Sequence, residues 1–323
     1  MDKVANPHDA FFKNLLSRRE LAVDFFSTCM PKSIREGMDF STLTLQKDSF
    51  VDNRLSQEFS DLLFTADLKG EQAVFYFLIE HKSYISGNIV LQLYSYIGRV
   101  MESYKKSEKQ GLPVVVPVVI YQGKGRWSEA SCLHDHIPGY DGLSEEIKSW
   151  IPDFSYWLVD LSHLDQFQLE NHKILQQFLI FARDMIVVDD KDFVYCVGDT
   201  VIVVGQVADK DRENEYLDMI TYYFYNGKKE IDPSDIRKLV AYIEDRYPEG
   251  SERIMTLAEK LEAIGREEGR EEGREEGREE GRIIQSVLIY RNEMGMAAWE
   301  IKEKIMDKFA LSEDQAEMYM KEA

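Results

Sequence analysis

The chain has 323 residues, of which 44% are apolar and 30% charged, and its formal net charge at pH 7 is −20. A chain of this length and composition folds as one large or two modest globular domains, which excludes a disordered acidic tail. Its longest apolar stretches run to about ten residues, well short of the roughly twenty that cross a bilayer, so we expect no membrane partner.

The charge is unevenly distributed along the chain. Residues 1–130 hold 16 basic and 16 acidic side chains, whereas residues 131–323 hold 23 basic and 43 acidic ones. An acidic chain does not coat DNA by bulk attraction, because phosphate contacts need Lys and Arg. A local cleft with bound metal ions stays compatible with this charge.

The cysteine content and the N-terminus bear on the compartment. Cys29, Cys132 and Cys196 are far apart and odd in number, which argues against a disulfide framework. The first residues carry charges throughout and lack a secretory signal pattern. We therefore expect a cytoplasmic protein.

The first predicted elements are a helix and three strands. Residues 8–28 place apolar side chains at spacings of three and four, which predicts an amphipathic helix that Pro31 ends. Segments 43–51, 59–68 and 73–80 are rich in β-branched and aromatic residues and are predicted to be strands. Residues 69–71 form the turn of a predicted hairpin between the last two.

The middle of the chain continues with a helix predicted over 88–109 and strands over 112–121 and 156–161. This order predicts an α/β fold with a mixed sheet flanked by helices. Further on, helices are predicted over 166–185, 212–226 and 234–263, and residues 194–207 resemble a strand.

A tandem repeat separates this part from the C-terminus. The tetrapeptide GREE occurs four times from Gly265, ahead of Gly281-Arg282. Pairs of Glu and Arg three positions apart favour a helix by a few tenths of a kcal/mol, whereas each Gly costs about 1 kcal/mol. The repeat is predicted to be a helical spacer over 261–282, with a self-association helix as the alternative. Residues 283–323 then form a small helical module that could mediate a homodimer.

Three charged residues of the predicted hairpin suggest chemistry. Asp61 lies on its first strand, and Glu80 and Lys82 end the second strand two positions apart, on one face. Two carboxylates, with a backbone carbonyl such as that of His81, suit Mg²⁺ or Mn²⁺. Such an ion can activate water toward a phosphate, with Lys82 positioning that water. The competing interpretation is an exposed Glu80–Lys82 ion pair.

Several ordered motifs together resemble a known family over about residues 6–160. They are HDAFFKNLL, FSDLLF, FLIEHKS, QLYSYI and PVVVPVVIYQGKGRW. They look like the Rpn family of recombination-promoting nucleases, also labelled putative transposases and similar to the PD-(D/E)xK nuclease superfamily. The resemblance implies a restriction-endonuclease-like core, extended by helices to about residue 260, and Mg²⁺-dependent DNA cleavage that promotes recombination.

The resemblance also assigns roles to residues. Asp61 matches the Asp of the motif, Glu80 its second acidic residue and Lys82 its Lys, although many relatives carry Gln at that position. Ser60 stands where the motif has Pro. Gln92 matches a polar position near the site, and Glu58 is a lesser candidate for contact with metal or water.

Other candidates are weaker. The string Cys132-x-His134-x-His136 has no second ligand pair at zinc spacing and is interpreted as an ordinary loop. His8-Asp9 is interpreted as a cap of the first helix. Gly123 and Gly125 lack the spacing of a phosphate-binding loop and are interpreted as a turn.

Beside that turn, Lys124, Arg126 and Trp127 are possible contacts to a DNA backbone.

Two other functions compete with the nuclease. The first is a non-catalytic regulatory or assembly protein in which the Glu-x-Lys pair is structural. The second is a transposase that uses three acidic residues on an RNase H-like fold, for which no third carboxylate with strand context is found.

Overall fold

The structure, a computed structural model, describes residues 7–46, 62–80, 89–106, 111–167, 169–227, 233–248, 270, 274 and 277–323. The chain divides into two compact units, Asp2–Ala258 and Glu259–Ala323. The elements of the first unit follow in chain order: α1 (Pro7–Ser17), α2 (Arg19–Cys29), α3 (Lys32–Arg35), β1 (Met38–Leu45), β2 (Leu62–Leu68), β3 (Glu71–Glu80), α4 (Ile89–Lys106), β4 (Val114–Tyr121), α5 (Glu145–Lys148), β5 (Trp157–Asp160), α6 (Lys173–Val187), α7 (Asp190–Val204), α8 (Lys210–Gly227) and α9 (Pro233–Arg246).

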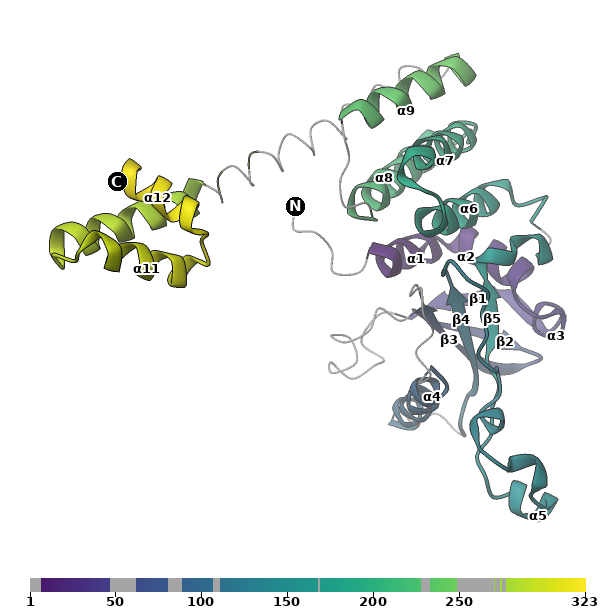
Figure 1. Ribbon diagram of the computed structural model, residues 1–323. Helices are drawn as coiled ribbons and strands as arrows, with labels where there is room; N and C mark the ends of the chain where they lie inside the picture. Colours follow the sequence, from purple (N-terminus) through teal and green to yellow (C-terminus); the bar gives the residue numbers. More distant parts are fainter. Residues whose placement is uncertain are drawn as a thin grey trace. The chain divides into compact units, whose positions relative to one another are not determined.

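The five strands form one mixed sheet in the order β1-β2-β3-β4-β5. The pairs β1–β2 and β2–β3 are antiparallel, whereas β3–β4 and β4–β5 are parallel. Helix α4 connects the parallel strands β3 and β4, as such a crossover requires. The predicted α/β fold with a mixed sheet flanked by helices is confirmed (Figure 1).

The hairpin between β2 and β3 is also confirmed. Its register runs from Leu62 opposite Phe77 to Leu68 opposite Glu71. Lys69 and Gly70 make the turn with φ of 56° and 87°, and the Asp67 carboxylate accepts the Gly70 N–H at 2.7 Å. Two consecutive left-handed residues match the right-handed twist of paired strands, which is why this turn type joins hairpins.

Helices cover both faces of the sheet (Figure 1). One face, which we call the aromatic face, carries Phe64 and Phe75, whose ring centroids lie 5.3 Å and 5.1 Å from that of Phe26 in α2. The other face, which we call the α4 face, buries Val74 and Val119 against the helix α4. The alternation of side chains along each strand produces these two faces.

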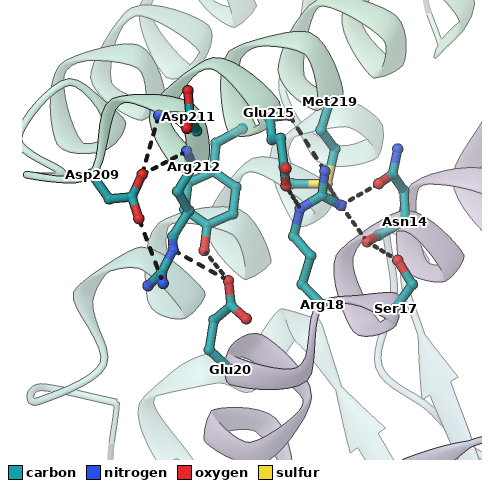
Figure 2. A network of polar contacts seen from close by, with 10 residues as sticks. Asn14, Ser17, Arg18, Glu20, Asp209, Asp211, Arg212, Glu215 and Met219 are labelled. Carbon is teal, nitrogen blue, oxygen red and sulfur yellow. Dashed lines mark hydrogen bonds and ion pairs between the residues drawn. The ribbon is translucent and has the colours of Figure 1, made fainter.

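The predicted helix over 8–28 is two helices in the structure. Arg18 between them is extended, with φ −82° and ψ 116°. Its guanidinium donates to the Asn14 carbonyl at 2.6 Å and lies 3.5 Å from the Glu215 carboxylate of α8 (Figure 2). The side chain thus donates, beside the Ser17 hydroxyl, to a carbonyl at the end of α1 that lacks a helical N–H partner.

A second set of contacts holds the start of α2 against α8 (Figure 2). The Glu20 carboxylate accepts the Tyr216 hydroxyl at 3.2 Å and lies 3.6 Å from Arg212 Nε. The break at Arg18 turns α2 toward the sheet while α1 packs on α8, where the rings of Phe11 and Tyr223 stack at 4.2 Å.

The prediction of a strand over 194–207 was wrong, because α7 occupies most of this segment. Its buried residues include Phe193, Val197, Val201 and Val204, which recur every three or four positions as on one face of a helix. The β-branched composition suggested a strand, and packing against α6 and α9 overrode that propensity.

Several predicted boundaries also shifted. Strand β1 begins at Met38, ahead of the predicted 43, and α6 begins at Lys173 rather than 166. The first part of the predicted helix over 234–263 corresponds to α9, which ends at Arg246, and residues 249–263 lie outside the described residues.

The second unit is helical. Residues 277–288 form a helix, continued by one π-helical turn over Ile289–Glu293, and α11 (Ala298–Phe309) and α12 (Glu313–Glu322) follow. Its core buries Val287, Ile301, Ile305 and Ala316. Most of the GREE repeat lies outside the described residues. Within the described part of the chain, no helix has the length and apolar character needed to span a membrane.

Candidate active site

The predicted catalytic residues are placed only in part. Asp61, His81, Lys82 and Glu58 lie outside the described residues. Glu80 is the last residue of β3, and Gln92 lies in the first turn of α4, where it is partly buried. The other residues of the site are therefore located relative to the backbone of Glu80.

A row of three residues runs across the carboxyl ends of the parallel strands. Glu80 of β3 pairs in register with Tyr121 of β4, and Tyr121 pairs with Asp160 of β5. Strict alternation puts position 80 on the same face as Val74, and position 121 on the same face as Val119, which is the α4 face. Ligands of open α/β sheets bind outside the carboxyl ends of such strands.

Tyr121 is the rigid middle of this row. It is buried, and its ring centroid lies 4.9 Å from that of Trp127, whose indole N–H donates to the Tyr156 hydroxyl at 2.9 Å. A Cβ at position 123 would overlap the Tyr121 ring, so Gly123 makes room for that ring. Steric exclusion of a side chain by Tyr121 therefore explains the first glycine of the YQGKGRW motif.

Asp160 supplies a carboxylate at a strand end, which the sequence analysis did not identify. It is buried, and its Oδ1 accepts the backbone N–H and the hydroxyl of Ser162 at 2.9 Å and 2.7 Å. These bonds cap the short 3₁₀ helix η4 (Leu161–Gln166) that follows β5. Asp160 thus shapes the edge of the sheet through a local structural role.

Gln122, directly after β4, begins a buried polar network that sequence reasoning missed. Its amide nitrogen donates to the Ala182 carbonyl of α6 and to the Tyr223 hydroxyl of α8, the latter at 2.8 Å. That hydroxyl lies 2.7 Å from His8 Nδ1 of α1. A hydroxyl that accepts from an amide has its proton available for an imidazole nitrogen.

Burial sets the chemistry of this network. Desolvation raises the pKa of Tyr223, so its hydroxyl stays neutral and able to donate. The Gln122 Oε1 is buried and has no hydrogen-bond partner among the described residues. The network joins α1, α6 and α8 to the carboxyl end of β4, one residue from the row that contains Glu80.

The structure also revises the interpretation of His8-Asp9. Both residues lie inside the first turn of α1, which begins at Pro7, rather than at its cap position. An acidic residue in the first turn is favourable because of the helix dipole. His8 has a long-range role through Tyr223, which local pattern did not reveal.

Two cations stand in the loop that leaves β4. Lys124 and Arg126 are exposed, and neither forms an ion pair within the part of the chain that the structure describes. Cations without acidic partners can contact phosphates at low desolvation cost.

Comparisons with known proteins agree with the motif resemblance. A family model described as "Putative transposase, YhgA-like" matches residues 6–215. Recombination-promoting nuclease RpnD of Escherichia coli O157:H7 is 24% identical over 80% of this chain and 94% of its own. Recombination-promoting nuclease RpnC of Escherichia coli K12 is 25% identical over 81% and 82%.

A third relative carries a different description. The inactive recombination-promoting nuclease-like protein RpnE of Escherichia coli K12 is 26% identical over 81% of this chain and 84% of its own. No solved structure matches the chain. The relatives that cover most of the chain thus include proteins named as nucleases and one named as inactive.

Proposed function

The chain belongs to the family of YhgA-like putative transposases, and from this premise we propose that it is a metal-dependent DNA endonuclease whose cuts promote recombination. The relatives named as recombination-promoting nucleases support the reaction class. The fold supports it with a mixed sheet in which three parallel strands end at one edge.

One observation carries the proposal: Glu80 ends β3 in register with Tyr121 and, through it, with Asp160. The proposal requires the β2–β3 register, in which Leu62 lies opposite Phe77, to continue by one pair. Asp61 would then lie opposite Leu78, two positions from Glu80 and on the same face of the hairpin.

The donor set suits a hard divalent cation. Carboxylates of Asp61 and Glu80 and the carbonyl of His81 are oxygen ligands, which Mg²⁺ and Mn²⁺ prefer. When bound, such an ion lowers the pKa of a coordinated water and offsets negative charge on the phosphate. Lys82 would hold the attacking water by a hydrogen bond, and Gln92 would position its partners from α4.

The chain is acidic overall, so binding to DNA requires local positive charge. Lys124 and Arg126 follow Tyr121 of the row by three and five residues and are exposed. We assign them to contacts with the DNA backbone near the cut. Since only a few phosphates are gripped, binding should be weak and sensitive to salt.

Cleavage of supercoiled plasmid in Mg²⁺ tests the assignment. Asp61→Ala and Glu80→Ala should each lower the rate at least about 100-fold, because each removes charge that the reaction needs. Glu71→Ala is the matched control, since Glu71 is exposed at the opposite end of the same strand β3. Unchanged cleavage by the first two variants would refute the site.

A non-catalytic binding protein is the second candidate, and relatives named as inactive favour it. Titration calorimetry with Mg²⁺ and Mn²⁺ separates the two functions. The nuclease binds metal, and Lys82→Met lowers its turnover without changing its stability. In the binding protein, metal binding is absent and Lys82→Met alters stability alone. Lys105→Met, at an exposed position near the end of α4, serves as the control.

A further inference from the structure

The connection between β4 and β5 brings three metal-ligating side chains together, none of which belongs to the proposed nuclease residues. Ligand atoms of Cys132, His134 and Asp135 all lie within 4.8 Å of one another. The sequence suggested His136 as the third member of the string. In the structure, His136 Nε2 instead lies 3.2 Å from the Ala130 carbonyl, and the neighbouring Asp135 joins the cluster.

His134 is held by one carboxylate at two points. Asp153 Oδ2 lies 2.8 Å from His134 Nδ1, and Asp153 Oδ1 accepts the His134 backbone N–H at 3.1 Å. The imidazole also stacks on the Tyr140 ring at 5.1 Å. Metal-binding histidines commonly donate their other ring nitrogen to a carboxylate, which fixes the tautomer and the ring orientation.

The remaining ring nitrogen faces the second ligand. His134 Nε2 lies 3.5 Å from Asp135 Oδ1. Two ligand atoms at about 2.1 Å from a tetrahedral zinc ion are about 3.4 Å apart, so this pair already has the spacing of bound ligands. The carboxylates of Asp135, Asp141 and Asp153 also surround the ring with negative charge, which attracts a cation.

Cys132 is positioned from the opposite strand segment. It forms an isolated antiparallel bridge with Ser155, whose hydroxyl lies 3.0 Å from the Cys132 sulfur. Asp153 and Ser155 therefore fix His134 and Cys132 from the same returning segment. Cys132 and His134 are partly exposed and Asp135 is exposed, so an ion can enter from solvent.

We propose that Cys132, His134 and Asp135 bind a zinc-class divalent ion, with Asp153 as the residue that positions His134. Thiolate, imidazole and carboxylate together suit Zn²⁺ or Co²⁺, whereas Mg²⁺ takes oxygen ligands. Three protein ligands leave a fourth position for water. The ion would hold residues 132–135 in place, and the hydrogen bonds of Asp153 and Ser155 join this segment to the returning one.

Co²⁺ titration of the metal-stripped full chain tests the site, because a thiolate bound to Co²⁺ gives a charge-transfer band. We expect one Co²⁺ per chain with that band, and displacement by Zn²⁺. Cys132→Ser should abolish the band. Asp153→Asn, which keeps all three ligands, should weaken Co²⁺ binding about 10- to 100-fold. Cys196→Ser and His136→Ala are matched controls that should bind as the wild type does.

A measurement on the unaltered protein complements the variants. Zn²⁺ should slow alkylation of Cys132 by iodoacetamide, mapped by mass spectrometry, and leave the rate at Cys196 unchanged. Equal alkylation of Cys132 with and without Zn²⁺, or a Co²⁺ band that survives Cys132→Ser, overturns the proposal. Glu80→Ala should retain the Co²⁺ band, so the Cys132 site can be tested even if the nuclease proposal fails.

Discussion

The two faces of the sheet differ in how they are built. The aromatic face packs rings against rings, with Phe26 fully buried against Phe64 and Phe75. The α4 face packs against α4 and combines apolar packing with polar atoms, among them the Tyr156 hydroxyl and the Asp160 carboxylate. Helix α4 also leaves Leu91 and Tyr94 exposed.

The aromatic face contributes mainly to stability, whereas the α4 face carries residues of the proposed chemistry. Close ring packing on the aromatic face buries much apolar area, which stabilises the fold. Position 80 and Gln92 belong to the α4 face, and the cations Lys124 and Arg126 follow the middle strand of the row. Substitutions on the two faces should therefore affect different measurements.

The largest expected effect lies on the aromatic face. Phe26→Ala should lower the free energy of unfolding by about 3–5 kcal/mol, because it leaves a cavity among packed rings. Phe154→Ala is the comparison on the α4 face, where Phe154 is only partly buried and stacks on Tyr94. In urea unfolding, Phe154→Ala should lower the free energy of unfolding by less than half as much as Phe26→Ala does. Equal losses would mean that the faces do not differ in packing.

The buried network at the end of β4 predicts the next effect. Tyr223→Phe keeps the ring stacked on Phe11 but removes the hydroxyl shared by Gln122 and His8. Unfolding should become easier by about 1–3 kcal/mol, since the Gln122 amide and His8 Nδ1 each lose one hydrogen bond. Tyr222→Phe is the control, because the neighbouring Tyr222 is exposed. Equal free energies of unfolding for the two variants would mean that the network does not contribute to stability.

Charge near the α4 face predicts an effect on DNA rather than on stability. Lys124→Ala and Arg126→Ala should each weaken DNA binding up to about ten-fold and lower the slope of log K against log salt by about one. Lys32→Ala, which removes an exposed cation paired with Glu36, should change neither quantity. Fluorescence anisotropy at several salt concentrations measures both. An unchanged slope would place the DNA elsewhere.

The smallest effect concerns pH. Burial raises the pKa of Tyr156, on the α4 face, from 10.0 to about 12. A folded-state pKa above the unfolded one gives stability that is complete below pH 10 and is lost as pH rises toward 12. Between pH 10 and 11, the free energy of unfolding of the wild type should fall by on the order of 1 kcal/mol more than that of Tyr156→Phe, because Phe cannot ionise. Parallel pH profiles would contradict the burial of this hydroxyl.

Local pattern was enough to predict much of the fold. Alternating and continuous apolar runs predicted β2, β3, β4 and β5, the Lys69-Gly70 turn predicted the hairpin, and the order of elements predicted the mixed sheet. These features depend on residues a few positions apart. The ordered motifs identified the family for the same reason, because they stand in the sequence itself.

Tertiary contacts decided the rest. Arg18 breaks the first helix where it meets Glu215, and α7 is a helix despite its β-branched residues. The register of Glu80, Tyr121 and Asp160, the contact of Gln122 with Tyr223, and the approach of Asp153 to His134 join residues about 20 to 100 positions apart. Periodicity within one segment determines which side of that segment is apolar, whereas only packing determines which distant side chain it meets.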